Sequence, residues 1–273
     1  MNKIVVLCLV TSLSVLACST NVMGRSSMAF MPESMLNKMG AESYADQKKQ
    51  LPISKDQRSS EIVHRVAQRL IEKCKEMYPS EVEGFQWEVS LFDDPKTPNA
   101  YAMPGGKIGI YTGILPICET ESGLAAVMGH EIGHAILQHG NERVTTQLVT
   151  TGAITAVGAV ASVSDIFGDE TTKGAVMGAL GAGAQYGVVL PFSRGNESEA
   201  DDFGIKLMAA AGYDPSAAPQ IWQNMKKLGE SGPEYMSTHP SHDRRIQDLE
   251  AQMPAAMKFY EKAPQKYGMG DRF

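Results

Sequence analysis

Three residues with clear chemical potential, His130, Glu131 and His134, lie in the run HEIGH at positions 130–134. Two histidines four residues apart on an α-helix are offset by about 40° around the axis and by one turn along it, so both imidazoles can face one ion. Glu131 lies between them, close enough to act as a base on water at such an ion. Catalytic zinc takes three protein ligands and keeps one open position, so the run predicts a metal site with a third ligand from elsewhere.

Acidic residues on a later helix are the candidates for that third ligand. Glu197 and Asp201 are four residues apart on one face of a predicted helix, so one can bind the metal while the other accepts an N–H from a ligand histidine. Glu199 points to another side of this helix. His139 follows His134 by five residues, about 140° around the helix, and is predicted to be a helix-end residue. The alternative for the acidic run is a solvated first helical turn, where the helix dipole favours carboxylates.

Periodic apolar residues predict the helices and strands that must position these side chains. The predicted helices span 56–77, 120–139, 197–211, 216–228 and a last segment from about 243, and the predicted strands span 86–92 and 107–112. Gly129 and Gly133 leave room beside the two histidines of the motif. The pattern predicts a mainly α-helical α+β fold.

Two uncharged stretches, at 144–164 and 174–193, are each about as long as the roughly 20 residues of a membrane-spanning helix. Their composition points elsewhere, because the first is rich in Thr and the second in Gly and Ala, with few Leu, Ile or Phe. We therefore expect helices of small residues that pack tightly within the protein, in preference to a helical hairpin in a membrane.

Composition excludes several classes of protein. The chain has 273 residues and is 43% apolar, which is enough for a full core. Its formal net charge of −6 and its pI near 5.6 argue against a nucleic-acid partner, because neutralising phosphates requires clustered basic side chains. A mean hydropathy of −0.19 argues against a protein with many membrane spans.

The N-terminus is typical of an export signal followed by an anchor. Residues 1–17 carry an apolar run that is too short to span a membrane. The run ends in LAC at 16–18, which resembles the lipobox of bacterial lipoproteins, and Ser19 then implies sorting to the outer membrane. We predict a signal peptide at 1–17 and a tether at 18–54 that begins with lipidated Cys18 and contains one helix at 35–49. The protein is then periplasmic and anchored to the outer membrane by this lipid.

Two further cysteines, Cys74 and Cys118, fall in the remaining segment, which is predicted to be one catalytic domain at 55–273. In an oxidising compartment such a pair permits one disulfide that closes a long loop. Two separately buried thiols are the alternative, and the sequence favours neither. No metal-binding or nucleophile pattern surrounds either cysteine.

Four sequence elements together resemble the gluzincin metallopeptidases, a family that includes the CAAX prenyl protease, the HtpX-type proteases and the soluble periplasmic quality-control proteases of Gram-negative bacteria. The resemblance covers about residues 55–250. In chain order the elements are NAYA at 99–102 with PGG at 104–106, HEIGH at 130–134, SRGNESEAD at 193–201, and HPS at 239–241 followed by RRI at 244–246. Since the stretches that span membranes in some relatives are rich in Thr, Ala and Gly here, the resemblance favours the soluble lipoprotein branch.

This resemblance implies a zincin-like domain in which a small sheet contributes an edge strand to the active-site cleft. It implies one Zn²⁺ per chain, with Glu131 as the general base and His239 as either an oxyanion donor or an inhibitory fourth ligand. The implied metal ligands are His130, His134 and Glu197, with Asp201 behind them, and the implied substrate-binding edge strand contains Asn99, Ala100, Tyr101 and Ala102.

The predicted function is that of a zinc-dependent endopeptidase that degrades misfolded or misassembled envelope and outer-membrane proteins. Its partners are then unfolded proteins and, through the lipid, a membrane, with no nucleic acid. The rival hypothesis is a membrane-tethered chaperone or assembly factor for outer-membrane proteins with little peptidase activity. Glu131 argues against this rival, because a pure binder needs no base beside two metal ligands. A zinc aminopeptidase, the third interpretation, would release single residues only.

Overall fold

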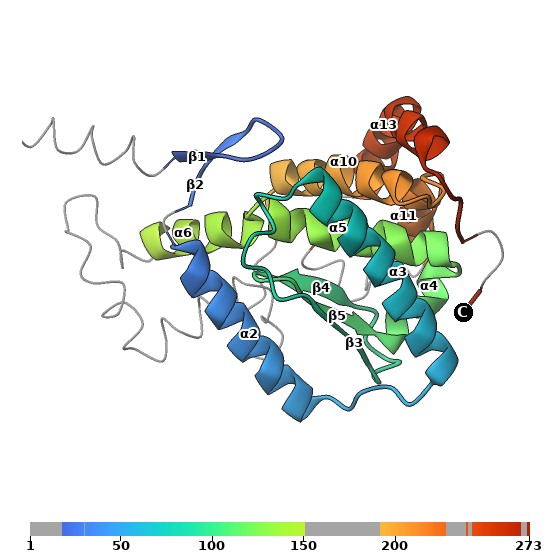
Figure 1. Ribbon diagram of the computed structural model, residues 1–273, viewed down its shortest axis with the longest axis horizontal. Helices are drawn as coiled ribbons and strands as arrows, with labels where there is room; N and C mark the ends of the chain where they lie inside the picture. The colour runs from blue at the N-terminus through green and yellow to red at the C-terminus, as the bar shows by residue number, and fades with distance from the viewer. Residues whose placement is uncertain (1–17, 30, 151–191, 228–238, 240–241, 269–271) are drawn as a thin grey trace, which may run out of the picture.

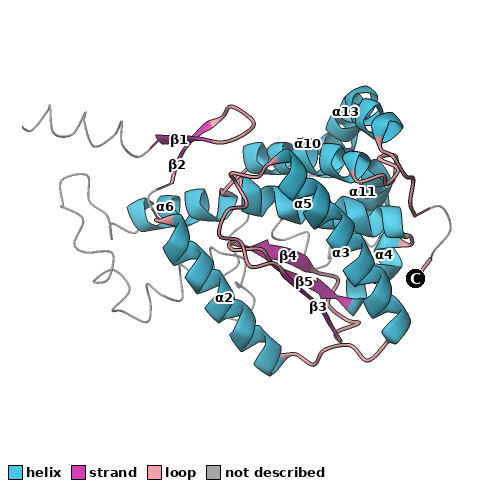
Figure 2. Ribbon diagram, in the orientation of Figure 1, coloured by secondary structure: helices cyan, strands magenta, loops and turns pink. Residues whose placement is uncertain are grey.

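The computed structural model describes residues 18–29, 31–150, 192–227, 239, 242–268 and 272–273. The signal peptide predicted at 1–17 and most of the two uncharged stretches at 144–193 lie outside the described residues. These residues form mainly helices, together with one three-stranded sheet and a small separate hairpin (Figure 2). The prediction of a mainly helical α+β fold is therefore confirmed.

The three-stranded sheet has the order β3-β5-β4, with β5 (Lys107–Tyr111) in the centre. β3 (Glu88–Phe92) runs parallel to β5, and β4 (Ala100–Met103) runs antiparallel to it. Residues 52–54 cover the outer side of β3, where the Ser54 N–H donates to the Leu91 carbonyl at 2.8 Å. β4 has no strand on its outer side among the described residues, and this open edge is the edge strand that the sequence predicted.

The central helix of the domain is α5 (Glu121–Ile136). The other helices that flank or follow the sheet are α3 (Gln57–Met77), α4 (Leu115–Cys118, preceded by the 3₁₀ turn η1, Thr112–Ile114), α6 (His139–Thr150), α10 (Arg194–Ala210), α11 (Ala217–Lys227) and α13 (His242–Lys262). Every residue of α5 is buried, since the helix lies between the sheet, α3, α10 and α11 (Figure 1). None of the helices in the described part of the chain is both long and apolar enough to cross a membrane.

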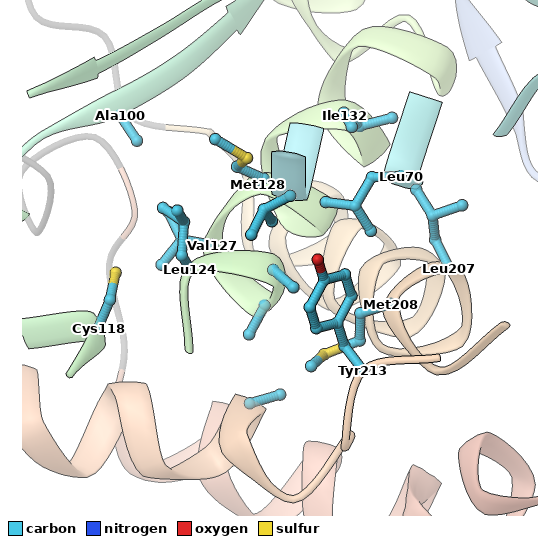
Figure 3. Close-up of a cluster of buried hydrophobic side chains, with 14 of the residues drawn as sticks. Leu70, Ala100, Cys118, Leu124, Val127, Met128, Ile132, Leu207, Met208 and Tyr213 are labelled. Atoms are coloured by element: carbon cyan, nitrogen blue, oxygen red, sulfur yellow. The ribbon is translucent and has the colours of Figure 1, made fainter. Parts of the chain in front are cut away.

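The main hydrophobic core forms where α5 meets α3 and α10. Apolar side chains from the three helices gather around the middle of α5 (Figure 3). Those that the figure labels on these helices are Leu124, Val127, Met128 and Ile132 of α5, Leu70 of α3, and Leu207 and Met208 of α10. Each is at most 2% exposed, so the helix that carries the histidine motif is fixed by close packing on several sides.

Capping side chains define where the two site-bearing helices begin. The Thr120 hydroxyl accepts a hydrogen bond from the Gly123 N–H at 3.1 Å and caps α5. Ser193 caps α10 in a capping box: its hydroxyl accepts from the Asn196 N–H, and the Asn196 side chain accepts from the Ser193 N–H. Such caps satisfy N–H groups that have no partner inside the helix. This capping box fixes the first turn of α10 and therefore the position of the acidic residues that follow it.

A pair of glycines brings the backbones of α5 and α10 into direct contact. A Cβ atom on Gly204 would lie 2.7 Å from the backbone nitrogen of His130, and one on Gly129 would lie 2.9 Å from the carbonyl oxygen of Gly204. Real side chains do not tolerate such distances. The predicted room beside the histidines is thus filled by another helix, and this contact places the acidic run of α10 against the histidine motif.

The N-terminal segment predicted to be a tether, 18–54, is folded onto the domain instead. It contains a hairpin of β1 (Cys18–Thr20) and β2 (Ser26–Met28), followed by α2 (Glu33–Gln50). α2 packs against β4 and β5, as Figure 1 shows. α2 agrees with the helix predicted at 35–49, but the packing of this helix on the sheet was not predicted.

Polar and aromatic contacts hold α2 on the sheet, which explains why apolar periodicity did not reveal its packing. The Tyr44 hydroxyl donates to Ser90 Oγ at 2.7 Å, and Gln47 Nε2 donates to the Tyr111 hydroxyl at 2.7 Å. Tyr101 donates to the other atom of the Gln47 amide. A buried amide with hydrogen bonds on both of its ends is well satisfied. The packing face of α2 therefore looks polar in the sequence although it is buried.

Candidate metal centre

Two histidines of α5 form the base of the site. His130 and His134 are 4% and 3% exposed, and their Nε2 atoms lie 3.0 Å apart. Burial lowers the pKa of His130 to about 4 and that of His134 well below its usual value, so both rings are neutral. Two neutral imidazoles with converging nitrogens are the arrangement that binds a divalent transition metal.

Glu197 of α10 completes a three-donor set. Its Oε1 lies 3.4 Å from His134 Nε2, and its Oε2 lies 3.6 Å from His130 Nε2. Ligands about 2.1 Å from a tetrahedral zinc ion are separated by roughly 3.4 Å, so the three groups are spaced as a zinc ion requires. Glu197 Oε1 is also buried without a hydrogen-bond partner in the described structure, which is costly unless a metal ion binds it.

Charge supports the same assignment. Burial is the largest cause that raises the pKa of Glu197 well above its usual value, and the neighbouring Asp201 and Glu131 raise it further. A divalent cation beside this carboxylate offsets that penalty. The donor set of two imidazoles and one carboxylate, with a position left open, is that of catalytic zinc.

Asp201 contacts the other ring nitrogen of the first histidine. Its Oδ1 lies 2.9 Å from His130 Nδ1. The Nδ1–H of His130 therefore donates to Asp201, and Nε2 is left with a lone pair for the metal. Glu197 is therefore placed to be a ligand, and Asp201 is placed to hold the tautomer of His130.

Arg245 of α13 holds both acids and is a residue whose role the sequence did not reveal. It is 2% exposed, donates to the two oxygens of Asp201 at 2.7 and 2.6 Å, and also donates to Glu197. Its guanidinium lies 3.6 Å from the ring centre of Trp222. Although burial raises the pKa of Asp201, Arg245 and His130 outweigh it and bring that pKa to about 2. The motif RRI at 244–246 contained this residue, but no spacing rule linked it to the metal.

His139 is the first residue of α6, so it is a helix-end residue as predicted, and it is not in the group of residues that could hold a metal. It also contacts His134, which the sequence did not predict. α5 ends at Ile136 and Gln138 has a φ of +56°, so a break separates His139 from the helix that carries the motif. His139 Nδ1 then lies 2.9 Å from His134 Nδ1, and its Nε2 lies 3.1 Å from Glu199 Oε2. The sequence missed this contact because it predicted one continuous helix over 120–139.

Glu131 and His239 lie on the open side of the donors. Glu131 is 2% exposed, and its Oε1 lies 3.6 Å from His239 Nε2. The ring of His239 lies 5.2 Å, centre to centre, from the rings of both His130 and His134. One ligand atom from each of His130, His134, Glu197 and His239 falls within 4.8 Å of the others, so His239 is within reach of the same ion.

A cleft opens beside His134. Phe192 lines the cleft and stacks on the His134 ring with 3.9 Å between the ring centres. The Arg143 guanidinium lies over the Phe192 ring, 3.8 Å from its centre. Neither residue was predicted. The remaining apolar and small residues along the cleft include Leu36 of α2, Phe85, Ala102 and Pro104.

The four residues of the predicted substrate strand lie at one edge, but their side chains have different environments. Ala102 lines the cleft. Ala100 is 1% exposed in the core, and the Tyr101 side chain is turned toward α2, where its hydroxyl donates to Gln47. The Asn99 side chain accepts a hydrogen bond from the Ala100 N–H at 2.9 Å. The edge therefore offers its backbone and one small side chain to the cleft.

The two cysteines of the domain are free and buried, so the structure contains no Cys74–Cys118 disulfide. Burial raises the pKa of Cys74 to about 12 and raises that of Cys118 further. Both thiols therefore stay protonated and act as small apolar side chains of the core.

Comparison with known proteins decides the family. Residues 57–253 match Peptidase family M48. The chain belongs to peptidase family M48. This region contains α3, the sheet, α5 and α10, and M48 metallopeptidases use zinc, for which the donor set described above is suited. The M48 match begins after α2, so the N-terminal hairpin and α2 lie outside it.

Individual relatives agree with the family and correct the predicted location. The chain is 36% identical over 197 residues to mitochondrial metalloendopeptidase OMA1 of Schizosaccharomyces pombe (71% of this chain, 53% of the relative) and 30% identical over 234 residues to metalloendopeptidase OMA1, mitochondrial, of Danio rerio (82% and 47%). It is 32% identical over 153 residues to beta-barrel assembly-enhancing protease of Yersinia pestis (55% and 31%). The chain thus spans about half the length of the first of these relatives.

The predicted periplasmic location, with an anchor in the outer membrane, is contradicted by these relatives. Those from fission yeast, budding yeast, a plant and several vertebrates are mitochondrial proteins, and they match over more of this M48 chain than the bacterial protease of Yersinia pestis does. The prediction relied on a short sequence at 16–18, which carries far less information than the metallopeptidase domain.

Proposed function

We propose that this M48 chain hydrolyses internal peptide bonds of unfolded or misassembled proteins, with Glu131 as the general base. The observation that carries the proposal is the position of Glu131. Its carboxylate is buried on the same helical turn as the two histidine donors but is not one of the four donor residues. A buried carboxylate beside a metal site and not bound to it is placed to move protons. The names of the relatives, which are metalloendopeptidases and proteases, support this activity.

The reaction would divide the work among residues already located. When bound, zinc acidifies the attacking water and polarises the carbonyl group of the scissile bond. Glu131 accepts the proton from the water and delivers it to the leaving nitrogen. Asp201 holds His130 in the tautomer that leaves Nε2 free, and Arg245 keeps Asp201 ionised. These residues prepare the site before any substrate arrives.

The open edge of β4 supports an extended polypeptide as the substrate. β4 borders the cleft through Ala102, and its outer side has no strand partner among the described residues. An extended peptide can add to such an edge through backbone hydrogen bonds, which require no particular side-chain sequence. Native proteins rarely present a long extended segment, so unfolded or misassembled chains are the proposed substrate class.

Glu131→Gln tests the proposal directly. The variant should keep zinc and its fold but lose casein cleavage by about 10²–10⁴-fold, because the base is removed while the metal donors remain. Zinc content and cleavage are measured with and without a chelator. Glu61→Gln, at an exposed position of α3, is the matched control and should cleave like the wild type. Full cleavage by Glu131→Gln would disprove the assignment.

His239→Ala separates the two roles that its position allows. If His239 donates to the oxyanion, cleavage should fall by about 10²-fold or more; if it acts as an inhibitory fourth ligand, cleavage should rise. The fragments formed from casein distinguish the remaining alternatives. Internal fragments support the endopeptidase, release of single residues supports the aminopeptidase, and suppression of aggregation without any fragments supports the chaperone.

The lipid on Cys18 stays a prediction, because the structure and the comparisons do not test it. Cys18 is the first residue of β1, which pairs with β2 in the N-terminal hairpin. Mass spectrometry of the N-terminal peptide from the protein purified from its membrane fraction tests the prediction, with a Cys18→Ser variant as the control that should lack the acyl mass.

A further inference from the structure

A continuous chain of polar contacts leads from His134 to the N-terminal hairpin, which we define as residues 18–28. His139 Nδ1 lies 2.9 Å from His134 Nδ1, and His139 Nε2 lies 3.1 Å from Glu199 Oε2. The next contact comes from the hairpin, where Arg25 Nε donates to Glu199 Oε2 at 2.6 Å. His139 is fully buried, while the Glu199 and Arg25 side chains are 14% and 32% exposed. The chain thus links a metal ligand to the edge of the domain.

These contacts allow only one arrangement of protons that leaves His134 able to bind a metal through Nε2. Its ring proton must then lie on Nδ1 and be donated to His139 Nδ1. His139 in turn carries its own proton on Nε2 and donates it to Glu199. In the reverse arrangement His139 would donate from Nδ1, which would move the proton of His134 to Nε2, the atom that faces the metal. An ionised carboxylate accepts hydrogen bonds and donates none, so Glu199 excludes the reverse arrangement.

The orientation of Glu199 depends on the hairpin. Arg25 donates to one of its oxygens, and Asn21 Nδ2 donates to the other at 3.0 Å. The remaining two nitrogens of the Arg25 guanidinium donate to the carboxylate of Glu142 in α6 at 3.0 and 2.6 Å. Asn196 of α10 also donates to Glu142, at 2.9 Å. The planar fork of an arginine can bridge two carboxylates in this fixed geometry, whereas a lysine cannot.

We propose that Arg25 is a positioning residue for the metal centre: it holds Glu199 so that His139 fixes His134 in the metal-binding tautomer. The hairpin, which lies outside the M48 match at 57–253, is then a functional part of the site in this chain. This inference rests on the metal centre and not on the identity of the substrate, so it stands or falls separately from the proposed peptidase activity.

Zinc affinity of the full chain is the decisive measurement. Arg25→Ala should raise the zinc dissociation constant by about 10–100-fold, as is usual when a residue behind a metal ligand is lost. Arg25→Lys should recover part of this loss. Competition with a chromogenic chelator gives the constant, and the visible spectrum of the Co²⁺-substituted protein reports the ligand geometry. Lys48→Ala is the matched control, because it removes a 2.6 Å ion pair between α2 and Glu88 of β3. It should leave both measurements within twofold of the wild type.

A double mutant shows whether Arg25 acts through Glu199. Glu199→Gln presents an amide that can donate to His139, so it should weaken zinc binding by itself. Adding Arg25→Ala to it should then have little further effect. Wild-type zinc affinity and Co²⁺ spectrum in a folded Arg25→Ala protein would overturn the proposal, and so would additive losses in the double mutant. If circular dichroism shows that Arg25→Ala is unfolded, Glu199→Gln decides alone: wild-type affinity in that folded variant overturns the proposal.

Discussion

The two histidine ligands are supported in different ways. Behind His130 lie Asp201 and Arg245, both at most 4% exposed and joined by two hydrogen bonds within the domain. Behind His134 lies His139, followed by Glu199 and the partly exposed Arg25 of the N-terminal hairpin. The contacts behind His130 involve only buried side chains, whereas the contacts behind His134 extend to a partly exposed side chain at the edge of the domain. A buried ion pair is costly to break, whereas a partly exposed one can be changed with less effect on stability.

The difference indicates a division between stability and adjustment. The His130 side ties α5, α10 and α13 together, so any change there should affect the fold and the metal at once. The His134 side ends on contacts that are more accessible to solvent, so changes there should affect the metal more than the fold. The following predictions, from the largest expected effect to the smallest, test this division.

Arg245→Ala should have the largest effect. It leaves the carboxylates of Asp201 and Glu197 buried without their cation, which typically costs about 3–5 kcal/mol in the free energy of unfolding. Urea denaturation of the metal-free protein measures this loss, and zinc content should fall as well. The adjacent Arg244 is 73% exposed, so Arg244→Ala should change stability by no more than about 0.5 kcal/mol. Equal losses of unfolding free energy in the two variants would mean that the buried contacts of Arg245 behind His130 do not stabilise the fold.

Gly204→Ala should have the second-largest effect. Its Cβ atom would lie 2.7 Å from the His130 backbone nitrogen, so α10 must move away from α5. We expect a loss of about 1–3 kcal/mol in the free energy of unfolding and a weaker zinc site, because Glu197 moves with α10. Gly195 is the control, since the nearest atom to its Cβ position is Ser193 Oγ at 3.7 Å. Gly195→Ala that destabilises as much as Gly204→Ala would show that the helix contact is unimportant.

His139 variants sharpen the other side of the comparison. His139→Leu removes the acceptor for His134 Nδ1–H and should raise the zinc dissociation constant by about 10–100-fold. His139→Gln can accept through its oxygen and donate through its nitrogen, so it should restore most of the affinity. Chelator competition measures both. Equal affinities in the Leu and Gln variants would mean that His139 fills space and does not set a tautomer.

Glu142→Gln should have the smallest effect. Its carboxylate is the second partner of Arg25 and its side chain is 24% exposed, so losing its charge should cost no more than about 1 kcal/mol. Zinc affinity should change by no more than about threefold, because the Arg25–Glu199 contact remains. Thermal unfolding and chelator competition measure the two quantities. A loss as large as that of His139→Leu would mean that Glu142, and not Glu199, is the main partner of Arg25.

Local sequence was sufficient for part of the site. The spacing of His130 and His134 predicted a shared metal, and the spacing of Glu197 and Asp201 predicted that one would bind metal and the other would orient a histidine. It could not say which acid does which. That choice depends on how far α10 lies from each ring, and the Gly129–Gly204 contact sets this distance between residues far apart in the chain.

Other features were missed for identifiable physical reasons. α2 was taken for part of a tether because its buried face is held by hydroxyl and amide hydrogen bonds, which apolar periodicity does not detect. The contact of His139 with His134 was missed because the left-handed backbone at Gln138 interrupts the helix. The two thiols could not be assigned to a bond or to separate burial, since that depends on where α3 and α4 lie.

The sequence by itself predicted the metallopeptidase family and a metal site at His130 and His134, because two ligands four residues apart on one helix obey a local spacing rule. Only the tertiary structure decided what stands behind those ligands. Arg245, His139, Glu199 and Arg25 reach the centre from α13, α6, α10 and the hairpin. A polar contact between distant segments leaves no periodic trace in the sequence, because it depends on the packing of several helices at once.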